Sequence, residues 1–303
     1  MFKWLILFSV FNGDIRHSIL KSHCIYQIIQ NINIPKSFGQ LTKLTFFGVD
    51  RNRLSGTIPS SMFNLSSLTT FAIAIKQIQG HLPLDIGITL PNIERLNFAH
   101  NQFIGSIPVS ISNASNLEIL ALNKNKLSGK VPSLEKLNRI SFFSITLNNL
   151  GSGGPNDLGF LYSLTNATNL TFLAINDNNF GGELPKCIGN LSTIEFSVFN
   201  YKISRKIPTE IGNLINLENL TNNKLSNNIP YETGKLQKLQ ILALNTNKFS
   251  GSIPSSLGNL TVLTHLYLYD NNLQGNIPLS LSKCRNLFTL NLHNNDLNGL
   301  ISP

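Results

Sequence analysis

The chain has 303 residues, of which 42% are hydrophobic, and a formal net charge of +9. This length is sufficient for a large buried core. Only 13% of the residues are charged, about half of the usual share, and no five basic residues follow one another. The composition therefore argues against a dedicated nucleic-acid surface. The three cysteines, Cys24, Cys187 and Cys284, are too scattered for a disulfide framework or a zinc site.

Residues 1–30 form an apolar N-terminal segment that begins MFKWLILFSVF. One lysine followed by an apolar run from Trp4 to Phe11 has the outline of a signal peptide, but no cleavage site of small residues follows. Two interpretations stay open, a signal peptide and a misassigned start. No apolar stretch reaches the eighteen or so residues of a membrane helix, so we expect no membrane span.

From residue 31 to residue 303 the dipeptide Ile-Pro, or a close variant, recurs at a nearly constant interval. The successive prolines are 24, 24, 25, 24, 53, 23, 22, 24 and 24 residues apart. The long interval holds two units, one of them enlarged over residues 137–166. The chain therefore contains about eleven repeats of a single unit, which indicates a solenoid.

The tenth unit, LTVLTHLYLYDNNLQGNIP at residues 260–278, shows what each repeat contains. Leu266 and Leu268 alternate with polar residues, which predicts a short strand with one buried face. Asn271 follows, where its side chain can bond backbone groups of the turn and of the next coil. Stacked units can bury leucines that one unit alone leaves exposed. The pattern predicts an α/β solenoid with a short parallel β-sheet on its concave face.

The asparagine recurs in nine units, and we expect it to form a structural ladder. Units two and seven carry Lys76 and Tyr201 in this slot, and Arg205 and Asn227 replace the usual glycine. We therefore expect irregular repeats over residues 191–230, either as a hinge or as a mark of sequence decay. The ladder residues are Asn52, Asn101, Asn125, Asn148, Asn178, Asn223, Asn247, Asn271 and Asn295.

The glycine-rich stretch GSGGPNDLGF at residues 151–160 has glycines at the spacing of a phosphate loop. Phe160 and Leu161 stand where such a loop needs lysine and Ser/Thr, so we expect no nucleotide and no other cofactor. Instead, Leu158, Phe160, Leu161 and Leu164 predict one apolar helical turn on the convex side. The histidines show no paired spacing, and we expect no metal site.

The repeats match L-x-x-L-x-x-L-x-L-x-x-N-x-L-x-G-x-I-P, and residues 148–170 read NNLGSGGPNDLGFLYSLTNATNL. With these motifs the chain resembles the extracellular part of plant leucine-rich-repeat receptor-like kinases. It is most similar to the group that includes the receptor for bacterial elongation factor Tu and the rice bacterial-blight resistance receptor. The resemblance implies a plant-type leucine-rich-repeat module in immune or developmental signalling. It also implies a peptide or protein ligand and a co-receptor kinase with leucine-rich repeats.

The glycine-rich kinase loop and the H-R-D and D-F-G motifs are absent from the sequence. We therefore expect no catalysis from these residues. Two other interpretations stay open: a freestanding secreted repeat protein that inhibits a wall-degrading enzyme, and a decayed receptor fragment.

The residues that flank the strand leucines are candidates for ligand contact on the concave face. Tyr267 and Tyr269 would anchor a peptide, because tyrosines give a large contact area with a polar tip. The alternative is that these tyrosines only pack against neighbours or under a glycan. Phe172 and Asn176 of unit six are expected on the same face. The other candidate contacts are His265, Asp270, His293, Arg95, His100 and Lys124.

Seven Asn-x-Ser/Thr sequons favour a secreted, glycosylated surface. We expect the chain at the extracellular face of the plasma membrane within a full receptor, and otherwise secreted. The sequons begin at Asn64, Asn113, Asn166, Asn169, Asn190, Asn219 and Asn259.

Overall fold

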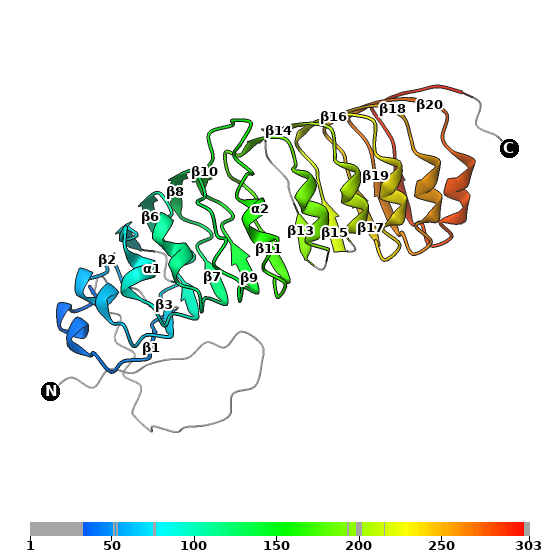
Figure 1. The fold of residues 1–303 in the computed structure, drawn as a ribbon. Helices are drawn as coiled ribbons and strands as arrows, with labels where there is room; N and C mark the ends of the chain where they lie inside the picture. The colour runs from blue at the N-terminus through cyan, green and yellow to red at the C-terminus, as the bar shows by residue number, and fades with distance from the viewer. Residues whose placement is uncertain are drawn as a thin grey trace.

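The computed structural model describes residues 33–299 except 51, 53, 75, 76, 193, 198–201 and 215. The predicted N-terminal segment and the substituted slots at Lys76 and Tyr201 lie outside the described residues. Figure 1 shows an elongated, curved stack of coils in which each repeat lies against the next.

The concave face is one parallel sheet of eleven strands in the described chain, arranged in sequence order. Its strands are short because only the residues around the first strand leucine of each repeat, such as His265–Tyr267 around Leu266, have extended backbone. In β19, Leu266 is fully buried while the residues on either side are half-buried. The prediction of a leucine-rich-repeat solenoid is confirmed. The strands are β1 (Phe46–Gly48), β3 (Thr70–Ala72), β5 (Arg95–Asn97), β7 (Ile119–Ala121), β9 (Phe142–Ser144), β11 (Phe172–Ala174), β13 (Glu195–Ser197), β15 (Asn216–Asn219), β17 (Ile241–Ala243), β19 (His265–Tyr267) and β21 (Thr289–Asn291).

A second row of strands runs along one flank of the stack and is interrupted at the enlarged repeat. The interruption falls between β10 and β12, where residues 151–180 intervene. The first sheet contains β2 (Gly56–Thr57), β4 (Ile78–His81), β6 (Gln102–Gly105), β8 (Lys126–Gly129) and β10 (Asn149–Leu150). The second contains β12 (Gly181–Gly182), β14 (Lys202–Arg205), β16 (Lys224–Asn227), β18 (Lys248–Ser252), β20 (Asn272–Gly275) and β22 (Asp296–Leu297).

The convex side is built from short helices, most of which begin directly after the repeat proline. Proline ends the flank strand because it cannot donate to a sheet, and its fixed φ suits the start of a helix. The helices are α1 (Ile86–Thr89), α2 (Leu161–Leu164) and the 3₁₀ helices Lys36–Gln40, Ser60–Asn64, Val109–Asn113, Lys186–Asn190, Thr209–Asn213, Tyr231–Lys235, Ser255–Asn259 and Leu279–Lys283.

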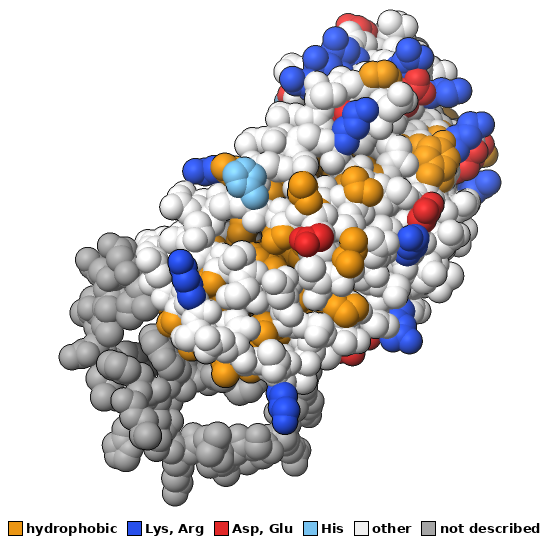
Figure 2. All heavy atoms as spheres, turned by 60° about the vertical axis from the view of Figure 1, so that its left-hand side comes forward, with side chains coloured by type: hydrophobic (Ala, Val, Ile, Leu, Met, Phe, Trp, Pro, Cys, Tyr) orange, Lys and Arg blue, Asp and Glu red, His pale blue; other side chains and the backbone are white. Residues whose placement is uncertain are grey.

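The hydrophobic core runs without a break through the whole stack. Each repeat adds its leucines and isoleucines to it. Near the N-terminal end it also contains a chain of phenylalanines, in which Phe71 and Phe98 meet edge to face at 5.0 Å and Phe98 stacks on Phe103 at 5.3 Å. Each fully buried side chain of this kind stabilises the fold by about 1.5–3 kcal/mol. Figure 2 shows a face on which hydrophobic side chains lie in small, separate groups between few charged ones.

Asn125 shows how the ladder joins neighbouring coils. Its Nδ2 donates to the carbonyl oxygens of Leu122 at 3.0 Å and of Phe98, in the preceding coil, at 2.9 Å. Its Oδ1 accepts from the backbone N–H of Phe103, also in the preceding coil, at 3.0 Å. The expectation that this side chain bonds to the following coil is therefore wrong, because it bonds to the preceding coil. The same pair of contacts is made by Asn101, Asn148, Asn178, Asn247, Asn271 and Asn295.

Two other ladder residues also bond to the turn that follows their own strand. Asn223 donates to the carbonyls of Leu220 and Thr221 in its own turn. Its counterpart in the preceding coil falls among residues 198–201, outside the described residues. Asn52 likewise donates to its own turn, through the carbonyls of Val49 and Asp50.

The enlarged repeat folds around the carboxylate of Asp157, which is 5% exposed. The carboxylate accepts from the backbone N–H groups of Ser152, Gly154 and Gly181 at 2.9–3.1 Å, and from the Ser152 hydroxyl at 3.0 Å. Burial alone would raise the pKa of Asp157, but these hydrogen bonds outweigh it and hold the pKa below its usual value. Gly181 belongs to the next repeat. The Asp157 side chain therefore both holds the conformation of the loop and attaches the loop to that repeat.

The apolar turn predicted after this loop is confirmed. Helix α2 (Leu161–Leu164) follows it, and the four apolar side chains are buried. They are Leu158, Phe160, Leu161 and Leu164.

The repeats over residues 191–230 are irregular, as the sequence predicts. The register between β13 and β15 shifts between Phe196 and Ser197, although the concave sheet continues through both strands. Arg205 and Asn227 occupy the glycine slot with positive φ values of 66° and 64°. Side chains at such φ values strain the backbone, asparagine less than most.

We predict that Asn125→Ala lowers the free energy of unfolding by roughly 2–4 kcal/mol. The substitution leaves the Phe103 N–H buried without a partner, at about 1–3 kcal/mol for such a group, and leaves the Phe98 carbonyl with only the Asn101 amide at 3.2 Å. Chemical denaturation followed by circular dichroism measures the change. Asn123→Ala, on the concave surface two residues earlier, is the matched control and should change stability by less than about 0.5 kcal/mol. Equal losses in the two variants would contradict the ladder's role.

A second prediction concerns acid. Because the folded-state pKa of Asp157 is depressed, its stabilisation is present above the unfolded pKa of about 3.9. It is lost as pH falls through the folded-state value. Asp157→Asn should therefore destabilise the chain at pH 7, and the difference from wild type should shrink as the pH falls below about 4. Thermal unfolding of both proteins across this range tests the prediction, with the exposed Asp85→Asn as control. A difference that is constant with pH would disprove it.

Candidate ligand-binding surface

The strand positions on either side of the buried leucine present two columns of side chains on the concave face. The register aligns Ile241 with His265 and Thr289, and Ala243 with Tyr267 and Asn291. Neighbouring strands lie about 4.8 Å apart, so side chains of one column touch those of the next repeat. The curvature of the stack makes this sheet the inner face (Figure 1).

Five rings of the tenth and eleventh repeats form a continuous group, which we call the aromatic cluster: Phe288, His265, Tyr267, Tyr269 and His293. The ring centroids of Phe288 and His265 are 5.9 Å apart, those of His265 and Tyr267 6.0 Å, and those of Tyr267 and Tyr269 6.4 Å. Tyr269 stacks on His293 at 4.6 Å with the ring planes 12° apart. The predicted contact residues of unit ten therefore form one surface with His293 of unit eleven.

The sequence analysis missed Phe288, which is 86% exposed. It precedes the strand β21, at the position where Thr264 stands in the previous repeat, as their shared register shows. The detectable signal was an aromatic residue in a slot that other repeats fill with polar residues, such as Thr171 and Gln240. Such exposure of a phenylalanine ring beside four other rings marks an apolar contact surface.

Hydrogen bonds hold the edges of the aromatic cluster. Nδ1 of His293 lies 2.6 Å from Oδ1 of Asn291, and Nδ1 of His265 lies 2.8 Å from the Thr264 hydroxyl. Each bond orients its imidazole ring against the neighbouring tyrosine, so the surface is organised before any ligand arrives.

Asp270 lies at the end of β19 in a left-handed turn, with φ of 55°. Its Oδ1 accepts from the Asn294 side chain at 2.7 Å. The carboxylate therefore lies at the border of the aromatic cluster and is partly occupied by a neighbour.

The remaining predicted contacts lie elsewhere. Arg95 is in β5, seven strands from β19, or about 34 Å along the sheet, and pairs with Glu118 at 3.5 Å. His100 and Lys124 occupy the left-handed turn before the ladder asparagine, with φ of 55° and 57°. The structure does not bring these three residues together with the aromatic cluster. Asn176, expected to be exposed, is only 9% exposed and lies two residues after the end of β11.

A second aromatic feature lies midway along the concave face. Phe142 and Phe172 stack in parallel, with ring centroids 4.5 Å apart and the planes 5° apart. They occupy the same column as Arg95, because β5, β7, β9 and β11 share one register. This pair supplies a flat apolar step between the two ends of the surface.

The sequons share a placement. Asn64, Asn113, Asn190 and Asn259 each end a 3₁₀ helix on the convex side and are exposed. Asn166 and Asn169 are exposed in the turn after α2. Asn219 differs, because it lies in β15 and pairs with Ala243 of β17.

The remaining side chains considered for chemistry are the metal-ligating residues and the two described cysteines. No three His, Cys, Asp or Glu side chains among the described residues are grouped to hold a metal ion. No helix within them is long and apolar enough to cross a membrane. Burial raises the pKa of the Cys187 thiol to about 11, so it is a poor nucleophile at neutral pH. Cys284 is buried against the Leu257 carbonyl.

Comparison with known proteins agrees with the geometry of the coil. The family described as Leucine Rich Repeat matches residues 92–114, 169–191, 238–260 and 262–284. The chain is a leucine-rich-repeat solenoid. Its relatives include the LRR receptor-like serine/threonine-protein kinase EFR of Arabidopsis thaliana, which is 41% identical over 88 residues, 28% of this chain and 8% of EFR. They also include the receptor kinase-like protein Xa21 of Oryza sativa subsp. japonica, 46% identical over 66 residues, 21% of this chain and 6% of Xa21.

Among solved structures, the leucine-rich-repeat ectodomain of the Arabidopsis thaliana receptor kinase GASSHO1/SCHENGEN3 aligns with a TM-score of 0.73 and 35% identity. The alignment covers 90% of this chain and 35% of the ectodomain, which was solved in complex with CASPARIAN STRIP INTEGRITY FACTOR 2. The chain thus spans only a small part of its relatives. What it shares with them is the repeat module, which contains no kinase.

Proposed function

We propose that this leucine-rich-repeat module is the ligand-recognising part of a plant receptor ectodomain, and that it binds a peptide or protein ligand across the aromatic cluster. The observation that carries the proposal is the run of five rings from Phe288 to His293 on the inner face of the curved stack, of which Phe288 and His293 are exposed and the other three half-buried. Similarity to ectodomains such as that of GASSHO1/SCHENGEN3 supports it.

Recognition would depend on rigid aromatic area. A ligand laid across β17, β19 and β21 would cover Tyr267, Tyr269 and Phe288, and each ring would lose little conformational freedom because it already packs against another. Aromatic side chains dominate binding energy at interfaces for this reason. Asp270 and His293 at the border would select polar groups of the ligand. Ile241, 47% exposed beside His265, extends the apolar area toward the ninth repeat.

Signalling follows from the receptor assignment. The described repeats contain the recognition surface, so a kinase and a co-receptor kinase with leucine-rich repeats would convert binding into a signal. We place the module at the extracellular face of the plasma membrane, where the sequons would carry glycans. Four of these lie in one row on the convex side and leave the aromatic cluster uncovered.

The test of ligand binding is a double substitution, Tyr267→Ala with Tyr269→Ala. A peptide selected from a random library on the wild-type chain should bind the variant at least roughly tenfold more weakly, since loss of two anchors exceeds the 1.4 kcal/mol that corresponds to tenfold. Isothermal titration calorimetry measures both affinities. Tyr162→Ala with Tyr231→Ala removes two exposed tyrosines outside the cluster and should leave the affinity unchanged. Equal affinity of a folded cluster variant and wild type would refute the assignment.

The glycan assignment makes a separate prediction. After expression in plant cells, Asn→Gln at any of the six exposed sequon positions should lower the mass by one N-glycan. Asn219→Gln should leave it unchanged, because sequons are modified in surface loops and Asn219 lies within the sheet. Intact-mass spectrometry before and after glycosidase treatment reads the outcome. A glycan at Asn219 would show that the acceptor is modified before β15 joins the sheet.

A further inference from the structure

Three neighbouring flank strands, β14, β16 and β18, each begin with a lysine, an apolar residue and a serine. The apolar residue is at most 1% exposed in each strand. Because successive side chains of a strand point to opposite faces, the lysine and the serine face the solvent together. Figure 1 shows these strands next to one another along one edge of the stack. We call the six polar residues the lysine–serine surface: Lys202, Ser204, Lys224, Ser226, Lys248 and Ser250.

The strand register places serines of this surface beside lysines of the next coil. Ser204 of β14 is aligned with Lys224 of β16, and Ser226 of β16 is aligned with Lys248 of β18. Aligned residues of neighbouring strands lie about 4.8 Å apart, so a hydroxyl and an ammonium group can reach the same ligand group. Successive lysines are offset by one strand and two residues, or roughly 8 Å. The surface therefore repeats one pair of hydrogen-bond donors from coil to coil.

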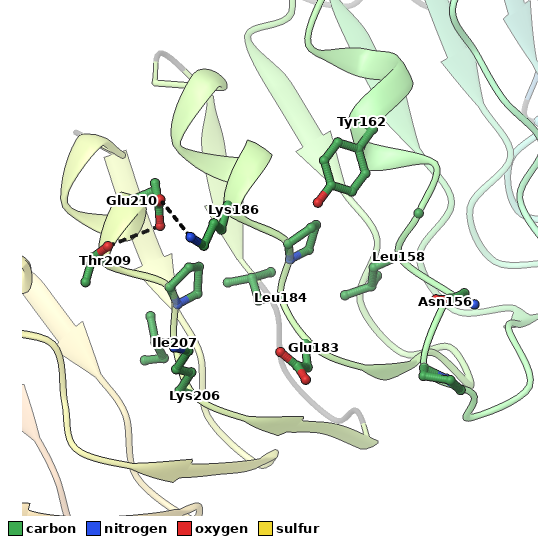
Figure 3. Close-up of a pocket in the computed structure, with 14 residues that line it drawn as sticks. Asn156, Leu158, Tyr162, Glu183, Leu184, Lys186, Lys206, Ile207, Thr209 and Glu210 are labelled. Atoms are coloured by element: carbon green, nitrogen blue, oxygen red, sulfur yellow. Dashed lines mark hydrogen bonds and ion pairs between the residues drawn. The ribbon is translucent and has the colours of Figure 1, made fainter.

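The positive charge of this surface is not balanced by acidic residues. β14, β16 and β18 contain no Asp or Glu. The three lysines are exposed and form no ion pair with another described residue. Carboxylates in the same coils belong to other cations: Glu183 pairs with Arg205 at 2.8 Å, and Glu210 pairs with Lys186 at 4.0 Å on the convex side (Figure 3). The net charge of +9 adds long-range attraction for anions.

The surface offers a ligand only polar groups. Asn227 and Asn272 stand beside it and are exposed, and none of the large exposed hydrophobic side chains belongs to these three strands. Protein interfaces have an apolar core, often with aromatic anchors, and single-stranded nucleic acids bind by stacking on aromatic rings. A ligand that matches ammonium, hydroxyl and amide groups has repeated carboxylates and hydroxyls and needs no apolar contact.

We propose that the lysine–serine surface binds a linear acidic polysaccharide, a chain of sugar rings with one carboxylate on each ring. The chain lies across β14, β16 and β18. Its carboxylates accept from the ammonium groups and from the aligned serine hydroxyls, and its sugar hydroxyls bond to the serines and to Asn227. A single ion pair is weak at an exposed surface, so affinity depends on repetition of the contacts along the polymer. The surface is separate from the aromatic cluster and does not depend on the ligand bound there.

The test measures binding of polygalacturonic acid to the wild-type chain by biolayer interferometry in calcium-free buffer. Lys224→Gln with Lys248→Gln should weaken binding at least roughly tenfold, and wild-type affinity should fall as salt rises. Both side chains are exposed, so the fold should be unchanged, which a thermal melt verifies. Arginine at the same two positions should retain most of the affinity. Ser226→Ala with Ser250→Ala keeps the charge and should weaken binding by a smaller factor.

The matched control is Lys235→Gln with Lys283→Gln, which lowers the net charge equally but on the convex side. It should bind as wild type does. Fully methyl-esterified polygalacturonic acid, which has no charge, should not bind. Poly-L-glutamate should bind more weakly than polygalacturonic acid, because it has carboxylates but no sugar hydroxyls. The proposal is overturned when the wild type does not bind polygalacturonic acid, when both lysine variants lose affinity equally, or when poly-L-glutamate binds as tightly.

Discussion

Seven coils of the described chain are attached to the one before by an asparagine amide. The side chain must satisfy carbonyl and N–H groups that the turn after each strand leaves without backbone partners, and it does so in two coils at once. The residue before it adopts a left-handed conformation to aim it inward. Since this contact uses backbone atoms of the neighbouring coil, it constrains almost nothing on the concave surface. Ligand-binding side chains can therefore change from repeat to repeat while the stack remains intact.

The same logic explains where the repeats depart from regularity. The register shift between β13 and β15 falls where Tyr201 and Arg205 replace the ladder asparagine and the turn glycine. The concave sheet nevertheless continues, because the leucines of both neighbours still share one core. Loss of the ladder asparagine and the turn glycine is thus accompanied by a shift in strand register, while the repeats stay packed on one core. The concave surfaces on both sides of the irregular repeats are therefore built on the same sheet and the same core.

The period of the sequence was sufficient to predict the solenoid, the strand positions and the buried turn at Leu161–Leu164, because burial imposes a strict spacing on leucine. The aromatic cluster was only partly predictable. Tyr267 and Tyr269 flank buried leucines, whereas Phe288 lies outside the strand pattern and meets His265 only through the register of neighbouring coils. The docking of the enlarged loop could not be predicted from the sequence, because the Asp157 carboxylate meets the Gly181 N–H of the next repeat, at 3.1 Å, only in the folded chain. Spacing along a chain contains no information on that distance.

The interruption of the flank strands between β10 and β12 divides the outer edge of the stack into two lengths. The concave sheet and the core still run through the junction, and the Asp157 carboxylate bridges it from one side. The enlarged repeat therefore separates two rows of flank hydrogen bonds, so a break in one row does not propagate along the flank into the other.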